Sequence, residues 1–250
     1  MADNIVFAEL TWTEIDEALK DRPVALVPVG AIEAHGPHLP VSTDTLIAVE
    51  MCRRGAKKLK AHGVPSLILP PVPFTLAEFG ADFPGTISVS PETSIGLLRD
   101  VAVSASKRFR AVAFATIHLE PQHLECVKKA MEEAKAAGAS ACFIDITKKR
   151  WADRLGAAFL AGDHAGAWET SLVMAAAPDK VRDHERRNLA PMEGLMPALK
   201  KGVKTFVEAG GEDAYFGDPT AASPEEGQAA FEVLGEILSV SVMEHLGSKA

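Results

Sequence analysis

The chain has no excess of positive charge, few cysteines and no long apolar run, and each of these absences excludes a class of protein. Its 250 residues include 26 Lys and Arg against 34 Asp and Glu, which gives a net charge of −8. Without a basic surface, nucleic acid and anionic membranes are poor partners. No apolar run approaches the length of a membrane span, and Met1–Asn4 opens without the basic and apolar pattern of a signal peptide. We therefore expect a cytoplasmic protein that binds neither membrane nor nucleic acid.

The three cysteines, Cys52, Cys126 and Cys142, are widely scattered along the chain. Their spacing fits neither a disulfide framework nor a cysteine metal site, and it is typical of a reducing compartment. A chain of 250 residues can bury one sizeable core, and nothing in the sequence requires a second one. We expect a single domain over residues 1–250.

Short apolar runs alternate with longer helical patterns. The runs at 24–29, 66–69, 111–117 and 141–146 are expected as buried strands. Helices are expected near residues 11–15, 45–60, 91–109, 121–137, 150–160, 167–174 and 224–245. This alternation predicts an α/β fold, a three-layer α/β/α sandwich with a mainly parallel sheet. A proline-rich loop at 70–86 interrupts it, and loops of that length are usually functional or disordered.

Two acid and imidazole pairs directly follow predicted strands. Glu33 and His35 come after the run at 24–29, and His118 and Glu120 come after the run at 111–117. Side chains two residues apart in an extended segment share a face, so each pair is expected to converge on one point. The carboxyl ends of parallel strands are where ligands collect. Because such pairs are costly to place together without a cation, the sequence predicts a divalent metal site.

Other residues of the polar segments have structural explanations as well. Asp44 could cap the helix that follows it, and Glu169 could occupy a first helical turn because carboxylates are favoured there. His38 and His123 are interpreted as groups that fix the loops rather than as ligands. Both explanations for Asp44 and Glu169, structural or metal-binding, remain open at this stage.

Residues 30–44, Gly-Ala-Ile-Glu-Ala-His-Gly-Pro-His-Leu-Pro-Val-Ser-Thr-Asp, resemble the signature of the creatininase (creatinine amidohydrolase) family. Three further segments, Leu10–Trp12, Pro84–Ser88 and His164–Ser171, resemble other parts of the family pattern in the same order. The resemblance implies a hydrolase with two divalent ions, zinc, manganese or iron. It implies that Glu33, His35, Asp44 and His118 are metal ligands.

The last ligand is left between two residues. Many family members carry Asn-Gly-His-Gly-Gly-Asn at the end of the third strand, whereas this chain has Thr116-Ile117-His118-Leu119-Glu120. That segment is closer to the His-Tyr-Glu of creatininase itself, with Leu119 at the tyrosine position. The resemblance therefore favours Glu120 as the fifth ligand, with Glu169 as its competitor.

The resemblance also implies a mechanism and a substrate class. Two ions bridged by Asp44 would activate a water to attack a small amide, and His164, together with Glu120, would act as a catalytic residue. His164 is suited to protonate the leaving amine. Substrate contacts are expected from Leu119, His123, Phe83 and Trp168. Cyclic amides, formamides and peptide termini are all processed by relatives, and we expect a non-peptide C–N bond. A homohexamer is implied, with residues 178–224 as a candidate for subunit contacts.

Two other classes of function stay open. A metal-dependent lyase or isomerase could use the same ions to stabilise an enolate. A metal-stabilised binding protein would hold its ions in closed coordination, although five acid or imidazole ligands exceed what a structural site needs.

Overall fold

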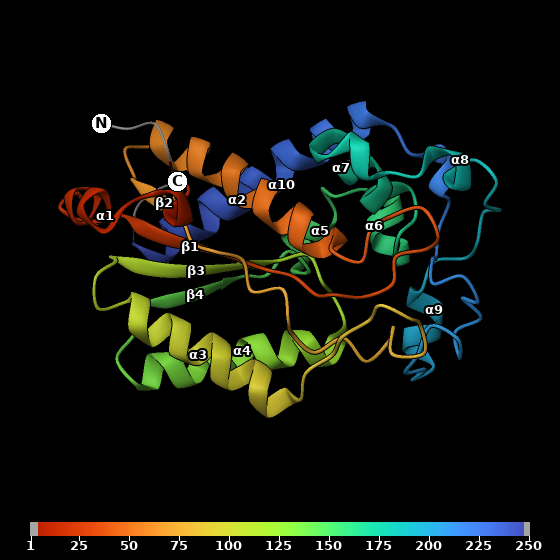
Figure 1. Ribbon diagram of the computed structural model, residues 1–250, viewed down its shortest axis with the longest axis horizontal. Coiled ribbons are helices and arrows are strands. Elements are labelled where there is room, and N and C mark those ends of the chain that lie inside the picture. Colours follow the sequence, from red (N-terminus) through yellow and green to blue (C-terminus); the bar gives the residue numbers. More distant parts are fainter. Residues whose placement is uncertain (1–4, 248–250) are drawn as a thin grey trace.

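A four-stranded parallel sheet with helices on both faces forms the centre of the computed structural model, which describes residues 5–247 (Figure 1). The strands are β1 (Val24–Val29), β2 (Ser66–Ile68), β3 (Ala111–Thr116) and β4 (Ala141–Ile144). Their order in the sheet is β2-β1-β3-β4, and every neighbouring pair is parallel. The predicted α/β/α sandwich is confirmed.

Both faces of the sheet are covered, which explains the continuous apolar runs of its central strands. Val24 and Leu26 of β1 belong to the core on one face, whereas Ala25 and Val27 belong to the core on the other. All six residues of β1 are buried. A strand buried on both sides cannot alternate polar and apolar residues, so it reads as an unbroken apolar run.

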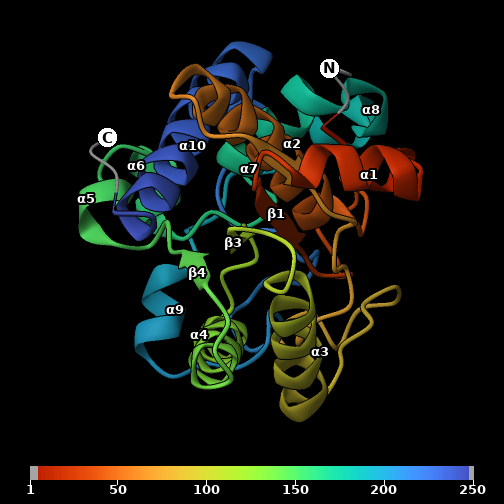
Figure 2. The same cartoon turned by 90° about the vertical axis from the view of Figure 1, so that its left-hand side faces the viewer.

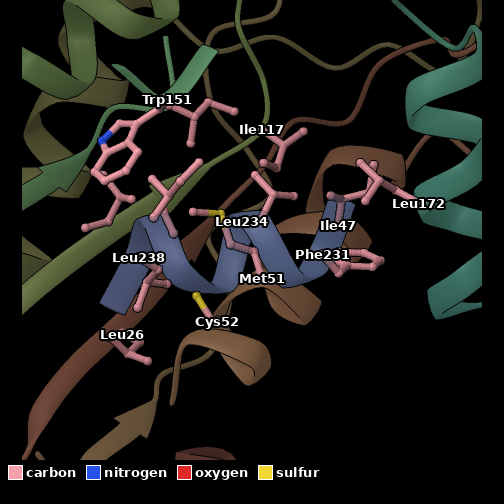
Figure 3. Close-up of a cluster of buried hydrophobic side chains, with 14 of the residues drawn as sticks. Leu26, Ile47, Met51, Cys52, Ile117, Trp151, Leu172, Phe231, Leu234 and Leu238 are labelled. Carbon is pink, nitrogen blue, oxygen red and sulfur yellow. The ribbon is translucent and has the colours of Figure 1, made fainter. Parts of the chain in front are cut away.

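One outer layer consists of α2 (Thr43–Ala61), α7 (Ala167–Ala176) and α10 (Pro224–His245). Phe231, Leu234 and Leu238 of α10 pack with Ile47 and Met51 of α2 in the larger core (Figure 3). The other outer layer consists of α3 (Pro91–Ala105) and α4 (Pro121–Ala136), which lie together across the sheet from α2 and α10 (Figure 2).

The helix starts were the most readable local signals. Ser90 caps α3 by accepting a hydrogen bond from the Thr93 amide at 3.2 Å, and Pro91 takes the first helical position. Pro121 begins α4 in the same way. A proline at that position loses no hydrogen bond because the first amides of a helix have no partner inside it.

The remaining elements are short: η1 (Phe7–Glu9), α1 (Trp12–Leu19), α5 (Lys149–Ala152), α6 (Ala157–Ala161), η2 (Pro178–Lys180), α8 (Asp183–Arg186), α9 (Met196–Lys200) and η3 (Pro219–Ala221). The prediction of one helix over residues 150–160 was wrong, because α5 and α6 are separate. Gly156 lies between them with φ of 93°, a non-helical conformation that favours glycine, so one helix cannot run through residues 150–160. The helix after residue 90 also ends at Ala105, four residues earlier than expected.

The pairing of the two central strands places the polar loops of the predicted site next to each other. β1 and β3 pair from Val24↔Ala111 to Val29↔Thr116, so their carboxyl ends lie level at one edge of the sheet. The loops that follow them, which carry the two acid and imidazole pairs, therefore start side by side. Within residues 5–247, no helix combines the length and apolar character needed to cross a bilayer.

Candidate active site

The segment after β1 folds back so that its polar side chains meet the first turn of α2. A Cβ at Gly30 would lie 2.6 Å from the backbone nitrogen of Thr45, so glycine is required where these segments touch. The Glu33 amide donates to the Val41 carbonyl at 3.1 Å and closes the intervening loop. Asp44 lies inside the first turn of α2, which begins at Thr43. This close approach brings Asp44 to the acid and imidazole pair of residues 33 and 35.

Asp44 lies between two imidazoles and presents one carboxylate oxygen to each. Its Oδ1 is 3.4 Å from Nε2 of His35, and its Oδ2 is 3.4 Å from Nδ1 of His118. A second carboxylate accompanies each imidazole. Oε2 of Glu169 is 3.7 Å from Nε2 of His35, and Oε1 of Glu33 is 3.0 Å from Nδ1 of His118. The cluster is thus two imidazole and carboxylate groups joined by one shared aspartate.

Each histidine of the site uses its other ring nitrogen to contact a backbone carbonyl. His35 Nδ1 lies 3.0 Å from the Glu33 oxygen, His118 Nε2 lies 2.9 Å from the Leu76 oxygen, and His164 Nε2 lies 3.0 Å from the Ala34 oxygen. A carbonyl can only accept, so these nitrogens carry the proton and donate. The opposite nitrogen of each neutral ring is then left with its lone pair. This arrangement is typical of metal-ligating histidines, whose orientation is fixed by such contacts.

The centre of the cluster holds buried polar atoms without a hydrogen-bond partner among the described residues: Glu33 Oε2, His35 Nε2, Asp44 Oδ1 and Asp44 Oδ2. A buried polar group without a partner is costly, and a buried carboxylate more so. These are lone-pair donors of the types that divalent cations take. The residues present therefore fit metal ions.

Electrostatics in the cluster reflect an excess of buried carboxylates. Burial by itself would lower the pKa of His35, but the neighbouring carboxylates, first of all Asp44, raise it to about 10. Burial would raise the pKa of Asp44, but His35 and His118 hold it below its usual range. The carboxylates thus favour positive charge at the imidazole positions.

Three groups at the border of the cluster have different proton affinities. Burial raises the pKa of Glu169 to about 8 and also raises the pKa of Glu120. Burial, with a contribution from His35, lowers the pKa of His164 to about 4. Neighbouring groups whose pKa values are shifted in opposite directions are common where protons are transferred.

Asp163 fixes the segment that carries His164 and Glu169. Its carboxylate accepts from the backbone amides of Trp168 and Glu169, each at 3.2 Å, and so caps the first turn of α7. Oε2 of Glu169 accepts from the Ala165 amide at 2.6 Å. Asp163 was not among the residues predicted for the site, although an aspartate just before a helical pattern is a recognisable capping signal.

A cavity of about 240 Å³ opens beside the cluster. Glu33, Asp44, His118, Glu120, His164 and Glu169 all contribute to its wall. Figure 1 shows that α6 and α9, which supply residues of the wall, lie at one end of the sandwich, away from α1. The candidate catalytic groups therefore face a space that a small ligand could enter.

The residues predicted for the site are found in two settings. The six predicted ligands, Glu33, His35, Asp44, His118, Glu120 and Glu169, and the predicted catalytic His164 lie in or beside the buried cluster. Of the predicted substrate contacts, Leu119 and Trp168 line the cavity. Phe83 instead packs near Phe206, and His123 is buried against the His118 ring, with ring centroids 4.7 Å apart.

Asp44 and Glu169 also satisfy their structural explanations in part. Both occupy the first turn of a helix, where a carboxylate is favoured. The oxygens of Asp44 nevertheless point to His35 and His118, and Glu169 reaches His35. Each of these two carboxylates can therefore stabilise the start of its helix and also face the histidines of the cluster. His38 is buried and its Nε2 lies 2.9 Å from the Thr170 hydroxyl, which suits the loop-fixing role expected of it.

Sequence reasoning missed most of the apolar cavity wall. Phe206 comes from the irregular stretch after α9, and its ring lies 4.2 Å from the ring of His164. Phe79 belongs to the proline-rich loop, and its amide donates to Oε2 of Glu120 at 3.1 Å. The length of that loop was the signal for Phe79, whereas no local pattern marked Phe206.

Comparison with known proteins shows which family and which fold the chain resembles. The chain is 32% identical over 215 residues to the mycofactocin precursor peptide peptidase of Mycolicibacterium smegmatis, covering 84% of this chain and 80% of the relative. It is 27% identical over 266 residues to the creatinine amidohydrolase of Pseudomonas putida, covering 98% of both. A solved structure titled "Creatininase Mn" has the same fold, with a TM-score of 0.72 and 21% identity over 97% of this chain and 98% of that one. The sequence model of the creatininase family, described as creatinine amidohydrolase, matches residues 8–241. The chain belongs to the creatininase family.

Proposed function

We propose that the protein is an amidohydrolase that uses two divalent metal ions to hydrolyse the C–N bond of a small amide. The observation that carries this proposal is the position of Asp44. One of its oxygens faces His35 and the other faces His118, each at 3.4 Å, and neither oxygen has a hydrogen-bond partner among the described residues. A carboxylate shared between two ligand groups is the feature expected of a two-ion site.

The distances suggest which ligands would hold each of the two ions. Glu33 and His118 would hold one ion, His35 and Glu169 would hold the other, and Asp44 would bridge them. Zinc, manganese and iron all accept this mixture of imidazole and carboxylate. Two similar structures, one titled "Creatininase Mn" and one of a mutant creatininase titled as the "Zn-Zn type", support manganese and zinc among these.

Glu33, His118 and Glu120 offer donor atoms that lie within 4.8 Å of one another, so by distance alone they could hold an ion. We nevertheless place Glu120 outside the ligand set, in contrast to the expectation from the sequence, because of the orientation of the His118 ring. Glu120 lies 3.8 Å from Nε2 of His118, the nitrogen that already donates to the Leu76 carbonyl. The other ring nitrogen, Nδ1, carries the lone pair and faces Glu33 and Asp44 instead. Since one imidazole nitrogen cannot both donate its proton and bind an ion, Glu120 is on the wrong side of the ring to share its metal.

When bound, the two ions would supply an activated water near neutral pH and polarise the amide carbonyl. Glu120 is held by the Phe79 amide at the cavity wall, and burial raises its pKa. It is therefore suited to accept a proton and pass it to the leaving nitrogen. His164 donates Nε2–H to the Ala34 carbonyl, and burial lowers its pKa to about 4, so the ring is neutral near pH 7. Its Nδ1 then keeps a lone pair that can accept a proton or a hydrogen bond next to the reacting groups.

Metal removal tests the proposal directly. Chelation with 1,10-phenanthroline and dialysis are expected to lower amide hydrolysis more than about 100-fold, and zinc or manganese should restore it. Metal analysis of the purified protein should give two ions per chain. In water labelled with oxygen-18, one labelled oxygen is expected in the carboxylate product. Turnover without label would show a lyase or isomerase, and tightly bound metal without turnover on any amide would show a binding protein.

Replacing His164 with alanine is expected to slow hydrolysis by about 100-fold or more while the metal content stays at two ions. The reason is that the accepting Nδ1 of the imidazole is lost while the proposed ligands remain. The measurement is kcat together with metal analysis of the same preparation. His62→Ala is the matched control, because His62 lies exposed at the end of α2. An unchanged kcat would remove His164 from proton transfer.

Two amide classes compete as substrates. The similarity to creatinine amidohydrolase supports the expected non-peptide C–N bond, while the more identical relative is named for a peptide substrate. A screen of cyclic amides, formamides and short peptides would separate them. A homohexamer remains a prediction from the family resemblance, to be measured by light scattering.

A further inference from the structure

Much of the wall of the cavity beside the carboxylate cluster is apolar. Phe159 and Leu160 come from α6, Leu199 comes from α9, and Phe79 and Phe206 come from loops. This wall reaches the proposed proton-transfer groups, because the Phe206 ring lies 4.2 Å from the His164 ring. A group on the substrate next to the scissile bond would therefore contact hydrocarbon.

The charged part of the cavity is entirely acidic apart from its histidines. Within residues 5–247, no lysine or arginine contributes to the lining, and the ionisable groups besides His118 and His164 are carboxylates. A substrate carboxylate away from the ions would have no cation to pair with, and it would lose its water against an apolar surface. A small polar ring would leave much of the wall without contact.

We propose that the substrate carries an uncharged apolar group, up to the size of an aromatic ring, directly beside the amide bond that is cleaved. This inference rests on the proposed two-metal function, since the ions would place the amide at the acidic end of the cavity. The apolar group would then extend toward α6 and α9. Recognition would come from burial of apolar surface, which is stabilising in proportion to the area removed from water.

Hydroxamates that differ in one substituent separate the metal site from the apolar wall. With zinc-loaded protein, we expect calorimetry to show that phenylacetohydroxamate binds at least about tenfold more tightly than acetohydroxamate, because the phenyl ring buries additional apolar area. A para-carboxylate on the same ring should remove that gain. Equal affinity for the methyl and phenyl compounds would overturn the inference. Failure of both compounds to bind would instead overturn the two-metal proposal, and this inference with it.

A charge placed in the wall gives a second, independent measurement. Leu160→Glu should lower affinity for phenylacetohydroxamate by about tenfold and leave acetohydroxamate unchanged, since the ring would meet a carboxylate. Leu160 is 46% exposed, so the variant should fold. Leu97→Glu is the matched control, because Leu97 is 42% exposed on α3, outside the cavity. An equal response of both hydroxamates to Leu160→Glu would contradict the proposed placement of the apolar group.

Discussion

Replacing Asp44 with asparagine is expected to abolish amide hydrolysis, with a rate at least about 1,000-fold below the parent enzyme, and to reduce the bound metal below two ions. The physical reason is the shared position of this side chain between His35 and His118. An asparagine offers one carbonyl oxygen and an NH₂ group that donates hydrogen bonds. It cannot present an anionic oxygen to both imidazoles, so one of the two proposed metal positions loses a ligand and its charge.

Metal analysis after gel filtration and a product assay on the same sample would measure both effects. Glu92→Gln is the matched control, because Glu92 is an exposed carboxylate in the first turn of α3, far in sequence from the cluster. It removes one charge from a helix start, as Asp44→Asn does, and should keep two ions and the full rate. Two bound ions and near-normal turnover in the Asp44 variant would show that this residue acts as a first-turn carboxylate alone.

Much of the fold could be predicted because local patterns record burial. The unbroken apolar run from Val24 to Val29 marks a strand covered on both faces, and the structure places it in the middle of the sheet. Pro224 and His245 were expected as the limits of the last helix and are the limits of α10. Ser223 caps it by accepting from the Glu226 amide at 3.2 Å. Caps, prolines and apolar runs act within a few residues, so the sequence is sufficient to read them.

The site was predictable to the extent that it follows the sheet. The pairs at 33–35 and 118–120 were assigned to the ends of two strands, and the parallel pairing of β1 with β3 makes these ends neighbours. The sequence could not show which ring nitrogen of each histidine carries the proton and which keeps its lone pair. That depends on carbonyls such as Leu76, which lies 42 residues before His118 in the chain.

The apolar wall was hidden for a similar reason. Phe159 and Leu160 were expected within one long helix, but Gly156, with a φ of 93°, interrupts it, and both residues lie on the short helix α6 beside the cavity. Phe206 lies in a stretch with no helix or strand pattern. Its place beside His164 is set by packing with Phe79 and Phe216, with ring centroids 5.9 Å and 5.7 Å away. Contacts between distant, irregular segments leave no periodic signal in a single sequence.

Exchanging Glu120 or Glu169 for glutamine should separate a proton-transfer group from a ligand. Glu120→Gln is expected to keep two ions and to lower kcat by about 100-fold to 10,000-fold, because the amide cannot carry the proton. Glu169→Gln is expected to lose the ion shared with His35, because a neutral amide replaces an anionic donor 3.7 Å from its Nε2. Both substitutions keep the size of the side chain, so changes in packing are small for each.

Metal stoichiometry decides between the two assignments, since both variants should be slow. Loss of one ion from Glu120→Gln, with two ions retained in Glu169→Gln, would reverse the roles and make Glu120 the fifth ligand. The contact of Glu120 with the Phe79 amide gives a reason to expect the first outcome. That hydrogen bond holds Glu120 at the cavity wall, on the side of His118 whose Nε2 already donates to the Leu76 carbonyl. Glu169 and Asp44, in contrast, both approach Nε2 of His35, the ring nitrogen that keeps its lone pair. A carboxylate can share an ion with an imidazole only if it lies near the ring nitrogen that carries the lone pair. Of the two glutamates, only Glu169 meets that condition.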